Sequence, residues 1–138
     1  MRFYIASSFK NSTLVKELSQ KLINYNYEHS YDWTKNQRAN SIEDLSTIGT
    51  KEKEAIIDSD FIVILLPAGK GSHIELGIAL GLEKRIYLYS PNQEIYHFDQ
   101  TTTFYHVEGV DKFVGTLENF TNYLIQKENN YRLQFLKV

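Results

Sequence analysis

A glycine-containing turn leads into a helical pattern that carries Glu75, within the segment Phe61–Gly77. Gly69 and Gly71 let the backbone approach a ligand closely, and a helix beginning near Ser72 points its unpaired N–H groups and its positive dipole end at the turn. Such a junction suits a small anionic or sugar-bearing ligand. Because a carboxylate in the first helical turn is biased toward its ionised form, Glu75 is a candidate nucleophile.

Glu75 also has a purely structural interpretation, because Ser72-His73-Ile74-Glu75 matches a capping box. In that arrangement the serine caps the helix and the glutamate side chain accepts a hydrogen bond from the serine N–H. The four residues alone favour this interpretation. However, a capping box has no use for the preceding Gly69-Lys70-Gly71, which favours ligand binding, so both interpretations stay open at this point.

Several well-known kinds of site are disfavoured. Gly69-Lys70-Gly71-Ser72 lacks the spacing of a Walker phosphate loop, and Ala6-Ser7-Ser8-Phe9-Lys10 holds no glycine where a dinucleotide fingerprint would begin. The four histidines show no close metal-ligand spacing, and the chain has no cysteine. We therefore expect no cofactor, no metal centre and no thiol nucleophile.

Length and charge narrow the class of protein. The 138 residues suit one domain spanning residues 1–138, and 15 Lys and Arg against 17 Asp and Glu give a net charge of -2. This balance offers no electrostatic footprint for polymeric nucleic acid or an anionic membrane. Residues 1–6 enter a strand pattern without a signal-like apolar core, and no segment approaches the length of a membrane span. We expect a cytoplasmic protein.

Strand and helix patterns alternate along the chain. The expected strands are residues 2–7, 27–33, 60–66, 85–89 and 104–107, and the expected helices are residues 12–23, a segment opened by Ser41, 72–82 and 112–126. This alternation predicts an α/β fold with a doubly wound, Rossmann-like parallel sheet of about five strands flanked by helices. The buried stripe of the helix opened by Ser41 is expected to comprise Ile42, Leu45, Ile48, Ala55 and Ile56.

Ligands of an open parallel sheet bind beyond the carboxyl ends of its strands. In this chain those ends are Ala6–Phe9, Asp32–Thr34, Ala68–His73 and Ser90–Pro91. The predicted substrate-binding residues are Ser7, Ser8, Phe9, Asp32, Trp33, Gly69, Lys70, Gly71, Ser72 and His73.

Several of these residues have plain alternatives. Trp33 is as typical of a buried ring as of one stacked on a ligand, and Asp32 is more typical of a turn than of a base. Tyr4 is consistent with simple core, although its hydroxyl could reach the crevice. The run Lys51-Glu52-Lys53-Glu54 is most simply a solvated helix face.

Together these features resemble the nucleoside 2-deoxyribosyltransferase family and its nucleotide N-glycosidase relatives. The resemblance runs from Phe3-Tyr4-Ile5-Ala6-Ser7, through Ser59-Asp60-Phe61-Ile62-Val63, to Ile74-Glu75-Leu76-Gly77-Ile78-Ala79. It implies that Glu75 is the nucleophile, which attacks the anomeric carbon, expels the base and forms a sugar ester. It further implies that Tyr4 positions this glutamate and that Glu52 is an acidic site residue, in place of the solvated role given above.

The chain departs from the family at one point. The transferases carry an aspartate in the loop ahead of the nucleophile, whereas Ala68-Gly69-Lys70-Gly71 supplies none, so protonation of the base is unassigned. Lys70, His73 or Asp32 could replace that contact, and Lys70 with Ser72 could equally hold a 5′-phosphate.

The resemblance therefore predicts an enzyme that cleaves or transfers the N-glycosidic bond of a nucleoside or nucleoside 5′-monophosphate. The alternative is a non-catalytic protein that binds a nucleotide-derived small molecule in the same crevice. The family also implies a homo-oligomer, in which residues 91–103 or the tail from Asn129 complete a neighbour's site.

Overall fold

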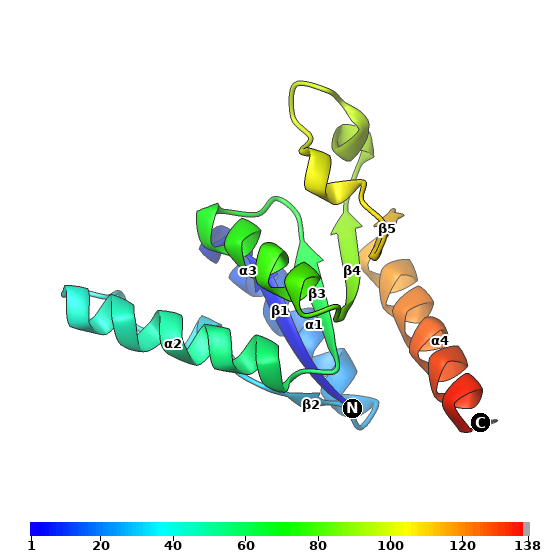
Figure 1. Ribbon diagram of the computed structural model, residues 1–138, viewed down its shortest axis with the longest axis horizontal. Helices are drawn as coiled ribbons and strands as arrows, with labels where there is room; N and C mark the ends of the chain where they lie inside the picture. The colour runs from blue at the N-terminus through cyan, green and yellow to red at the C-terminus, as the bar shows by residue number, and fades with distance from the viewer. Residues whose placement is uncertain (137–138) are drawn as a thin grey trace.

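The computed structural model describes residues 1–136 and contains a parallel five-stranded sheet with strand order β2-β1-β3-β4-β5 (Figure 1). The strands are β1 (Arg2–Ser7), β2 (Glu28–His29), β3 (Phe61–Leu65), β4 (Arg85–Ser90) and β5 (Val110–Val114). The helices are α1 (Ser12–Asn24), α2 (Ile42–Asp58), α3 (Lys70–Gly81) and α4 (Leu117–Leu136). The predicted α/β class with a doubly wound parallel sheet is confirmed.

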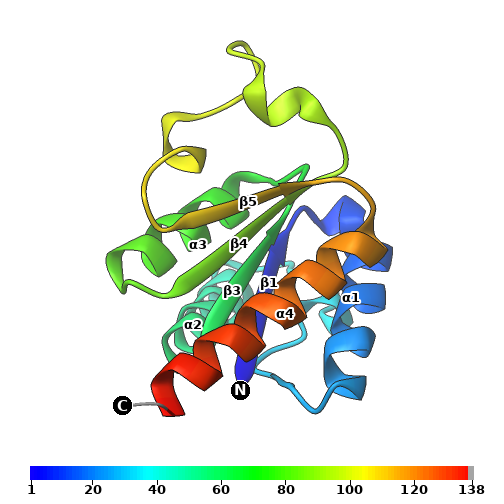
Figure 2. The same cartoon turned by 90° about the vertical axis from the view of Figure 1, so that its right-hand side faces the viewer.

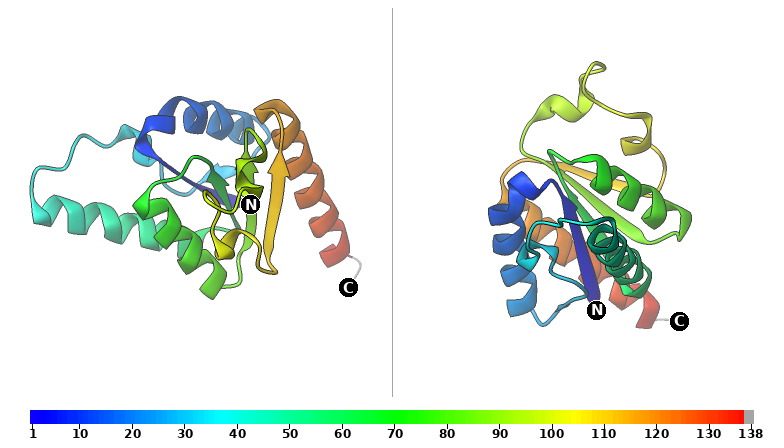
Figure 3. Two further views of the ribbon diagram at one scale, coloured as in Figure 1. Left: turned by 90° about the horizontal axis from the view of Figure 1, so that it is seen from above. Right: turned by 90° about the vertical axis from the view of Figure 1, so that its left-hand side faces the viewer.

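The helices cover both faces of the sheet. Helices α1 and α4 lie on one face, and α2 and α3 lie on the other (Figures 2 and 3). From β1 the chain moves outward to β2 on one side of the sheet, and from β3 it moves outward through β4 and β5 on the other side. The strand order therefore reverses between β1 and β3. A reversal of this kind opens a crevice between the two loops that leave the neighbouring strands.

The central strands form the core because both of their faces are covered. Every residue of β3 is buried, and β1 is buried from Phe3 to Ser7. Parallel strands in this position are built from continuous apolar runs. The aromatic rings of Phe3 and Phe61 lie 6.1 Å apart across the two strands, and Tyr87 of β4 meets the Phe61 ring edge-on at 5.8 Å. This rigid centre fixes where the loops at the carboxyl ends begin.

One element near the amino terminus differs from the expectation. The expected strand over residues 27–33 is wrong beyond Glu28–His29, because Trp33 lies in a 3₁₀ turn, Trp33–Lys35. Asp32 caps this turn by accepting a hydrogen bond from the N–H of Thr34 at 3.0 Å. A short polar side chain that bonds its own backbone competes with strand pairing.

The last strand and the last helix follow one another as predicted, but their predicted bounds are wrong. Residues 103–105 form a 3₁₀ turn, and the fifth strand is β5, which occupies the start of the region expected to be the last helix. All five β5 residues are only partly buried, at the sheet edge, and Asp111 and Lys112 hide the strand pattern. Helix α4 then continues through the predicted tail as far as Leu136, and residues 137–138 of that tail lie outside the described residues.

Helix α2 begins as predicted, because the Ser41 hydroxyl accepts from the N–H of Asp44 at 3.0 Å. Its predicted stripe is only half buried. Ala55 and Ile56 are in the core, but Ile42 is 80% exposed and Leu45 is 56% exposed. The first half of the helix projects away from the body of the protein (Figures 1 and 3). The predicted burial is therefore correct at Ala55 and Ile56 and wrong at Ile42 and Leu45.

Between β4 and β5 the chain makes a long excursion, here called the 91–109 segment. It contains the 3₁₀ turns Gln93–Tyr96 and Thr103–Tyr105 and rises beyond the carboxyl ends of the strands (Figure 2). Among residues 1–136, none of the helices combines the length and apolar character needed to cross a membrane.

Candidate active site

A cavity of about 510 Å³ opens where the strand order reverses, at the carboxyl ends of β1 and β3. Its lining comprises Ser7, Ser8, Phe9, Trp33, Asn36, Gln37, Arg38, Ala39, Ile48, Glu52, Gly69, Gly71, Ser72 and Glu75. Three of the four predicted loops thus contribute to one cavity. The fourth, Ser90–Pro91, lines a neighbouring cavity instead.

Two carboxyl groups and one phenol meet at the floor of this cavity. Tyr4, in the middle of β1, is fully buried and donates a short hydrogen bond to Glu75 Oε2. The Tyr4 hydroxyl also lies 3.1 Å from Glu52 Oε2. A phenol has a single hydrogen, so Tyr4 can donate it to only one of the two carboxyl groups at a time.

The three residues reach this point from separate elements. Glu52 is half-buried between exposed neighbours on α2, so the solvated-face interpretation of residues 51–54 is wrong at this position, as the resemblance implied. Glu75 belongs to α3 and is 8% exposed. Tyr4 precedes Glu75 by 71 residues and Glu52 by 48, so only the packing of α2 and α3 on β1 assembles the cluster.

Burial raises the pKa of Glu75 to about 8. The hydrogen bond from Tyr4 lowers this pKa, but the negative charge of Glu52 raises it further. Burial between two carboxylates also raises the pKa of the Tyr4 phenol far above its usual range. The expectation of a carboxylate biased toward ionisation is therefore wrong for the ligand-free protein, because loss of solvation outweighs the available donors.

The predicted helix start explains part of this error. Helix α3 begins at Lys70, with Gly69 as its cap, so Glu75 lies in the second turn and not in the first. The capping box of Ser72 with Glu75 is accordingly wrong. Ser72 instead accepts from the Gly69 N–H at 3.2 Å, which leaves the Glu75 carboxyl group free to meet Tyr4.

The ends of β1 and β3 are tied together beside the carboxyl cluster. The Ser7 hydroxyl donates to the carbonyl of Leu65 at 2.8 Å and accepts from Asn11 Nδ2 at 3.1 Å. Gly71 lines the cavity, and a Cβ atom added to it would meet nothing within 4 Å. The space around this glycine is therefore open.

Aromatic rings line the side of the cavity. Phe9 is 63% exposed, and its ring lies 5.9 Å from that of Trp33 at an angle of 44°. Trp33 is 7% exposed and donates from Nε1 to the Ile5 carbonyl at 2.6 Å. Trp33 is therefore part of the core and also lines the cavity, and its stacking on a ligand ring stays a prediction.

Three predicted binding residues do not line this cavity. Asp32 is used in the turn described above, where its carboxylate accepts from the backbone and the hydroxyl of Thr34. Lys70 is exposed on the first turn of α3. His73 lines the neighbouring cavity and contacts Tyr105 and Gly69.

Sequence reasoning missed five lining residues. Four are consecutive, Asn36 to Ala39, and the fifth is Ile48 on α2. The consecutive residues belong to a polar segment without periodicity, and only their position after the strand end pointed toward the crevice. Arg38 supplies the one cationic side chain among the residues that line this cavity.

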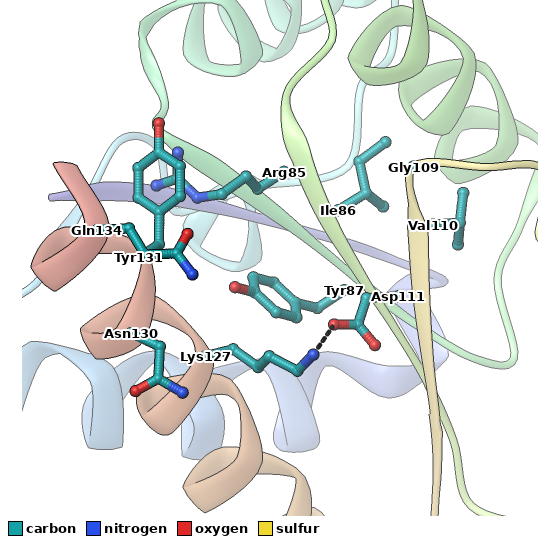
Figure 4. A pocket seen from close by; sticks show the side chains of 10 residues that line it. All are labelled: Arg85, Ile86, Tyr87, Gly109, Val110, Asp111, Lys127, Asn130, Tyr131 and Gln134. Carbon is teal, nitrogen blue, oxygen red and sulfur yellow. Dashed lines mark ion pairs between the residues drawn. The ribbon is translucent and has the colours of Figure 1, made fainter. Parts of the chain in front are cut away.

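A further cavity of about 620 Å³ lies between the start of β4, the start of β5 and the end of α4 (Figure 4). Its polar side chains are largely engaged with each other. Lys127 Nζ lies 3.7 Å from Asp111 Oδ2, and the Arg85 guanidinium stacks on the Tyr131 ring at 3.7 Å. It opens at the amino ends of these strands, where open parallel sheets do not place ligands. Within residues 1–136, no cluster of three or more His, Cys, Asp or Glu side chains could hold a metal ion.

Comparisons with known proteins agree with this architecture. Neither a protein-family profile nor a curated protein sequence matches the chain. The structure of CMP N-glycosidase from Clostridium botulinum is similar, with a TM-score of 0.58 and 18% identity over 91% of this chain and 99% of that one. The 2-deoxyribosyltransferase of Bacillus psychrosaccharolyticus is also similar, with a TM-score of 0.54 and 20% identity over 73% of this chain and 82% of that one. At these identities the likeness establishes the fold, and the fold that the sequence resemblance implied is confirmed.

Proposed function

We propose that this protein cleaves or transfers the N-glycosidic bond of a nucleoside or nucleoside 5′-monophosphate, as a member of the nucleoside 2-deoxyribosyltransferase and N-glycosidase group. One observation carries the proposal. The Glu75 carboxyl group lines a cavity at the reversal of the strand order and is held there by Tyr4, next to Glu52. The two similar solved structures, a CMP N-glycosidase and a 2-deoxyribosyltransferase, support the same chemistry.

In the proposed reaction the ionised Glu75 attacks the anomeric carbon of the sugar. A bond forms between a Glu75 oxygen and that carbon, while the bond to the base nitrogen breaks and its electron pair leaves with the base. Water or a second base then attacks the same carbon and releases Glu75 as a carboxylate, which is the retaining logic of many glycosidases. The acceptor alone distinguishes hydrolysis from transfer.

The protonation state of Glu75 decides when this attack is possible. The raised pKa of Glu75, about 8, favours its neutral form near pH 7. In the proposed reaction, Glu75 would pass its proton to the Tyr4 oxygen while Tyr4 passes its own to Glu52. Glu75 would then be ionised beside a protonated Glu52. The planar base would rest on the side of the cavity formed by Phe9 and Trp33, because aromatic faces stack on heterocycles.

A binding protein without catalysis is the second candidate. It is favoured by the same raised pKa of Glu75, since a neutral carboxyl group donates a hydrogen bond well but attacks poorly. In that case the protein would hold an intact nucleotide-derived molecule in the cavity.

One assay distinguishes the two functions. The protein is incubated with a panel of nucleosides and nucleoside monophosphates, with and without a free acceptor base, and released base is measured by chromatography. Release that disappears in Glu75→Gln and persists in Glu54→Gln, a matched change at an exposed glutamate of α2, supports the enzyme. Tight binding of an intact nucleotide, measured by calorimetry and without release of base, supports the non-catalytic binding protein instead. Base release that survives Glu75→Gln rules out the covalent mechanism.

A further inference from the structure

The 91–109 segment is connected to the start of α3 by His73. The Nδ1 atom of this histidine lies 2.7 Å from the carbonyl oxygen of Gly69, and its Nε2 atom lies 2.6 Å from the hydroxyl of Tyr105. The rings of His73 and Tyr105 are also stacked, with centroids 5.7 Å apart and planes inclined by 20°. Tyr105 is 5% exposed, so its side chain is anchored within the 91–109 segment.

The chemistry of the two partners fixes the direction of these hydrogen bonds. A carbonyl oxygen can only accept, so the hydrogen of neutral His73 is on Nδ1 and is donated to Gly69. The remaining ring nitrogen, Nε2, then accepts from the Tyr105 hydroxyl. The result is a directed chain from Tyr105 through His73 to the backbone of Gly69.

This chain ends on the turn that forms part of the candidate active site. Gly69 caps α3, and its N–H is donated to the Ser72 hydroxyl at 3.2 Å. Gly69, Gly71 and Ser72 all line the cavity that contains Glu75. A displacement of the Gly69 carbonyl would therefore move one side of that cavity.

His73 itself faces the other side of the same turn. There it lines a neighbouring cavity of about 570 Å³ together with Tyr105 and the Ser90–Pro91 end of β4. The turn is thus a partition between two cavities, and the Tyr105–His73 pair holds it from the side opposite to Glu75. The sequence predicted that His73 binds the substrate. Its position in the structure is better suited to supporting the turn.

We propose that Tyr105 and His73 are positioning residues, through which the 91–109 segment sets the position of the Gly69–Ser72 turn. The expected effect on kcat rests on the proposed function, whereas the expected change in the structure of the turn does not. Because an ångström-scale displacement of a substrate-holding group can lower a rate by about 10²-fold, loss of the chain should reduce kcat more than it changes KM.

Two conservative substitutions test the chain. Tyr105→Phe removes the hydroxyl and keeps the stacked ring, and His73→Asn keeps a donor near the position of Nδ1 while removing the acceptor for Tyr105. Tyr96→Phe is the matched control, because this tyrosine lies in the same segment and is 48% exposed. Thermal unfolding of each variant establishes that all are folded before comparison.

The structural readout needs no activity. Amide hydrogen exchange at Gly69 and His73, whose N–H groups are hydrogen-bonded to Ser72 and Gly69, and the ¹⁵N shifts of the His73 ring are measured by NMR. We expect the amides to exchange about tenfold faster in Tyr105→Phe. We also expect the Nε2 resonance of His73 to shift in that variant, and both signals to stay unchanged in Tyr96→Phe. Unchanged exchange at Gly69 and His73 in Tyr105→Phe would overturn the inference, whatever the activity.

The kinetic readout is a double-mutant cycle on nucleoside cleavage. Because both substitutions break one chain, we expect each to lower kcat by about tenfold with KM within about threefold, and the double variant to be no slower than the slower single variant. Fully additive losses, or a kcat equal to wild type in both variants, would contradict a shared positioning role. If the unaltered protein cleaves no nucleoside at all, the proposed function fails, while the exchange experiment still decides the positioning role.

Discussion

Two clusters in this protein combine a tyrosine hydroxyl with a buried glutamate, and they lie on opposite faces of the sheet, one under α2 and α3 and the other under α4. At the amino end of β4, the fully buried Glu128 accepts from Arg85 Nε at 2.9 Å and Arg85 Nη2 at 2.7 Å, and also from the Tyr87 hydroxyl. On the face covered by α2 and α3, Glu75 accepts from Tyr4, in the middle of β1, and faces Glu52.

The two clusters differ in the charge of their second partner. Burial lowers the pKa of the Arg85 guanidinium, but the hydrogen bonds and the charge of Glu128 outweigh it and keep that pKa raised. Around Glu75 the second partner is another carboxyl group, so burial and repulsion act together and its pKa is raised to about 8. A buried carboxylate with a cation stays charged and serves structure, whereas one without a cation keeps a proton that chemistry can use.

The largest expected effect separates the clusters by activity. If nucleosides are substrates, Glu75→Gln should lower kcat on the order of 10⁴-fold, because the nucleophile is lost. Glu128→Gln, on the other face of the sheet, should change kcat by less than about threefold, since Glu128 lies outside the residues that line the candidate cavity. Steady-state kinetics of both variants make the test. Equal losses in the two variants would remove the functional distinction between the clusters.

The next largest effect concerns the contribution of the Glu128 cluster to the stability of the fold. Glu128→Ala leaves the Arg85 charge without its bidentate partner, so we expect it to lower the free energy of unfolding by about 3–5 kcal/mol. Glu118→Ala, at an exposed glutamate of the same helix, should change it by less than about 0.5 kcal/mol. Urea denaturation measures both. A loss below about 1 kcal/mol in Glu128→Ala would mean that this ion pair is not structural.

The pH dependence of stability should have a definite sign at Glu75. Its pKa is raised from 4.5 to about 8 on folding, so the folded protein binds a proton that the unfolded chain releases. The associated stability is fully present below pH 4.5 and is lost as the pH rises through about 8. At about 1.4 kcal/mol per pKa unit this amounts to a few kcal/mol. Glu75→Gln should gain stability relative to the unaltered protein between pH 5 and pH 9, as followed by urea denaturation. A difference independent of pH would show that Glu75 is ionised throughout.

The smallest effects concern the two neighbours of Glu75. Tyr4→Phe removes the hydrogen bond that lowers the pKa of Glu75, so we expect this pKa to rise. Glu52→Gln removes the negative charge that raises it, so we expect the pKa of Glu75 to fall. Carboxyl ¹³C NMR titrations follow both changes, with Glu54→Gln as the control for Glu52. Shifts of the same sign in the two variants would contradict the arrangement of the cluster.

The sequence was a good guide to those elements whose pattern is local. The continuous apolar run of β3, the start of α2 at Ser41 and the region of α3 could be predicted, because side-chain periodicity and caps depend on residues close together in the chain. The edge strand β5 was missed, since an edge strand is half solvated and here contains Asp111 and Lys112. The exposed first half of α2 was missed because an apolar stripe does not state whether a partner surface is present.

The candidate site was also predictable only in part. Glu75, its glycine turn and the serines after β1 follow from the rule that parallel sheets place ligands at the carboxyl ends of their strands. The lining residues Asn36 to Ala39 were not predictable, because a polar loop carries no period. The positions of Asp32 and His73 were decided by hydrogen bonds to Thr34 and Tyr105.

The amino-acid sequence alone specifies which chemical groups this protein has and which of its locally patterned strands and helices carry them. It fixed a carboxyl group on a helix after a buried strand, and a tyrosine within the first strand. Only the folded chain brings Tyr4 and Glu75, which are 71 residues apart, into a hydrogen bond beside Glu52 and raises the pKa of Glu75 to about 8. The physical reason is that desolvation and charge repulsion depend on distance in space, whereas the patterns that predict strands and helices depend only on distance along the chain.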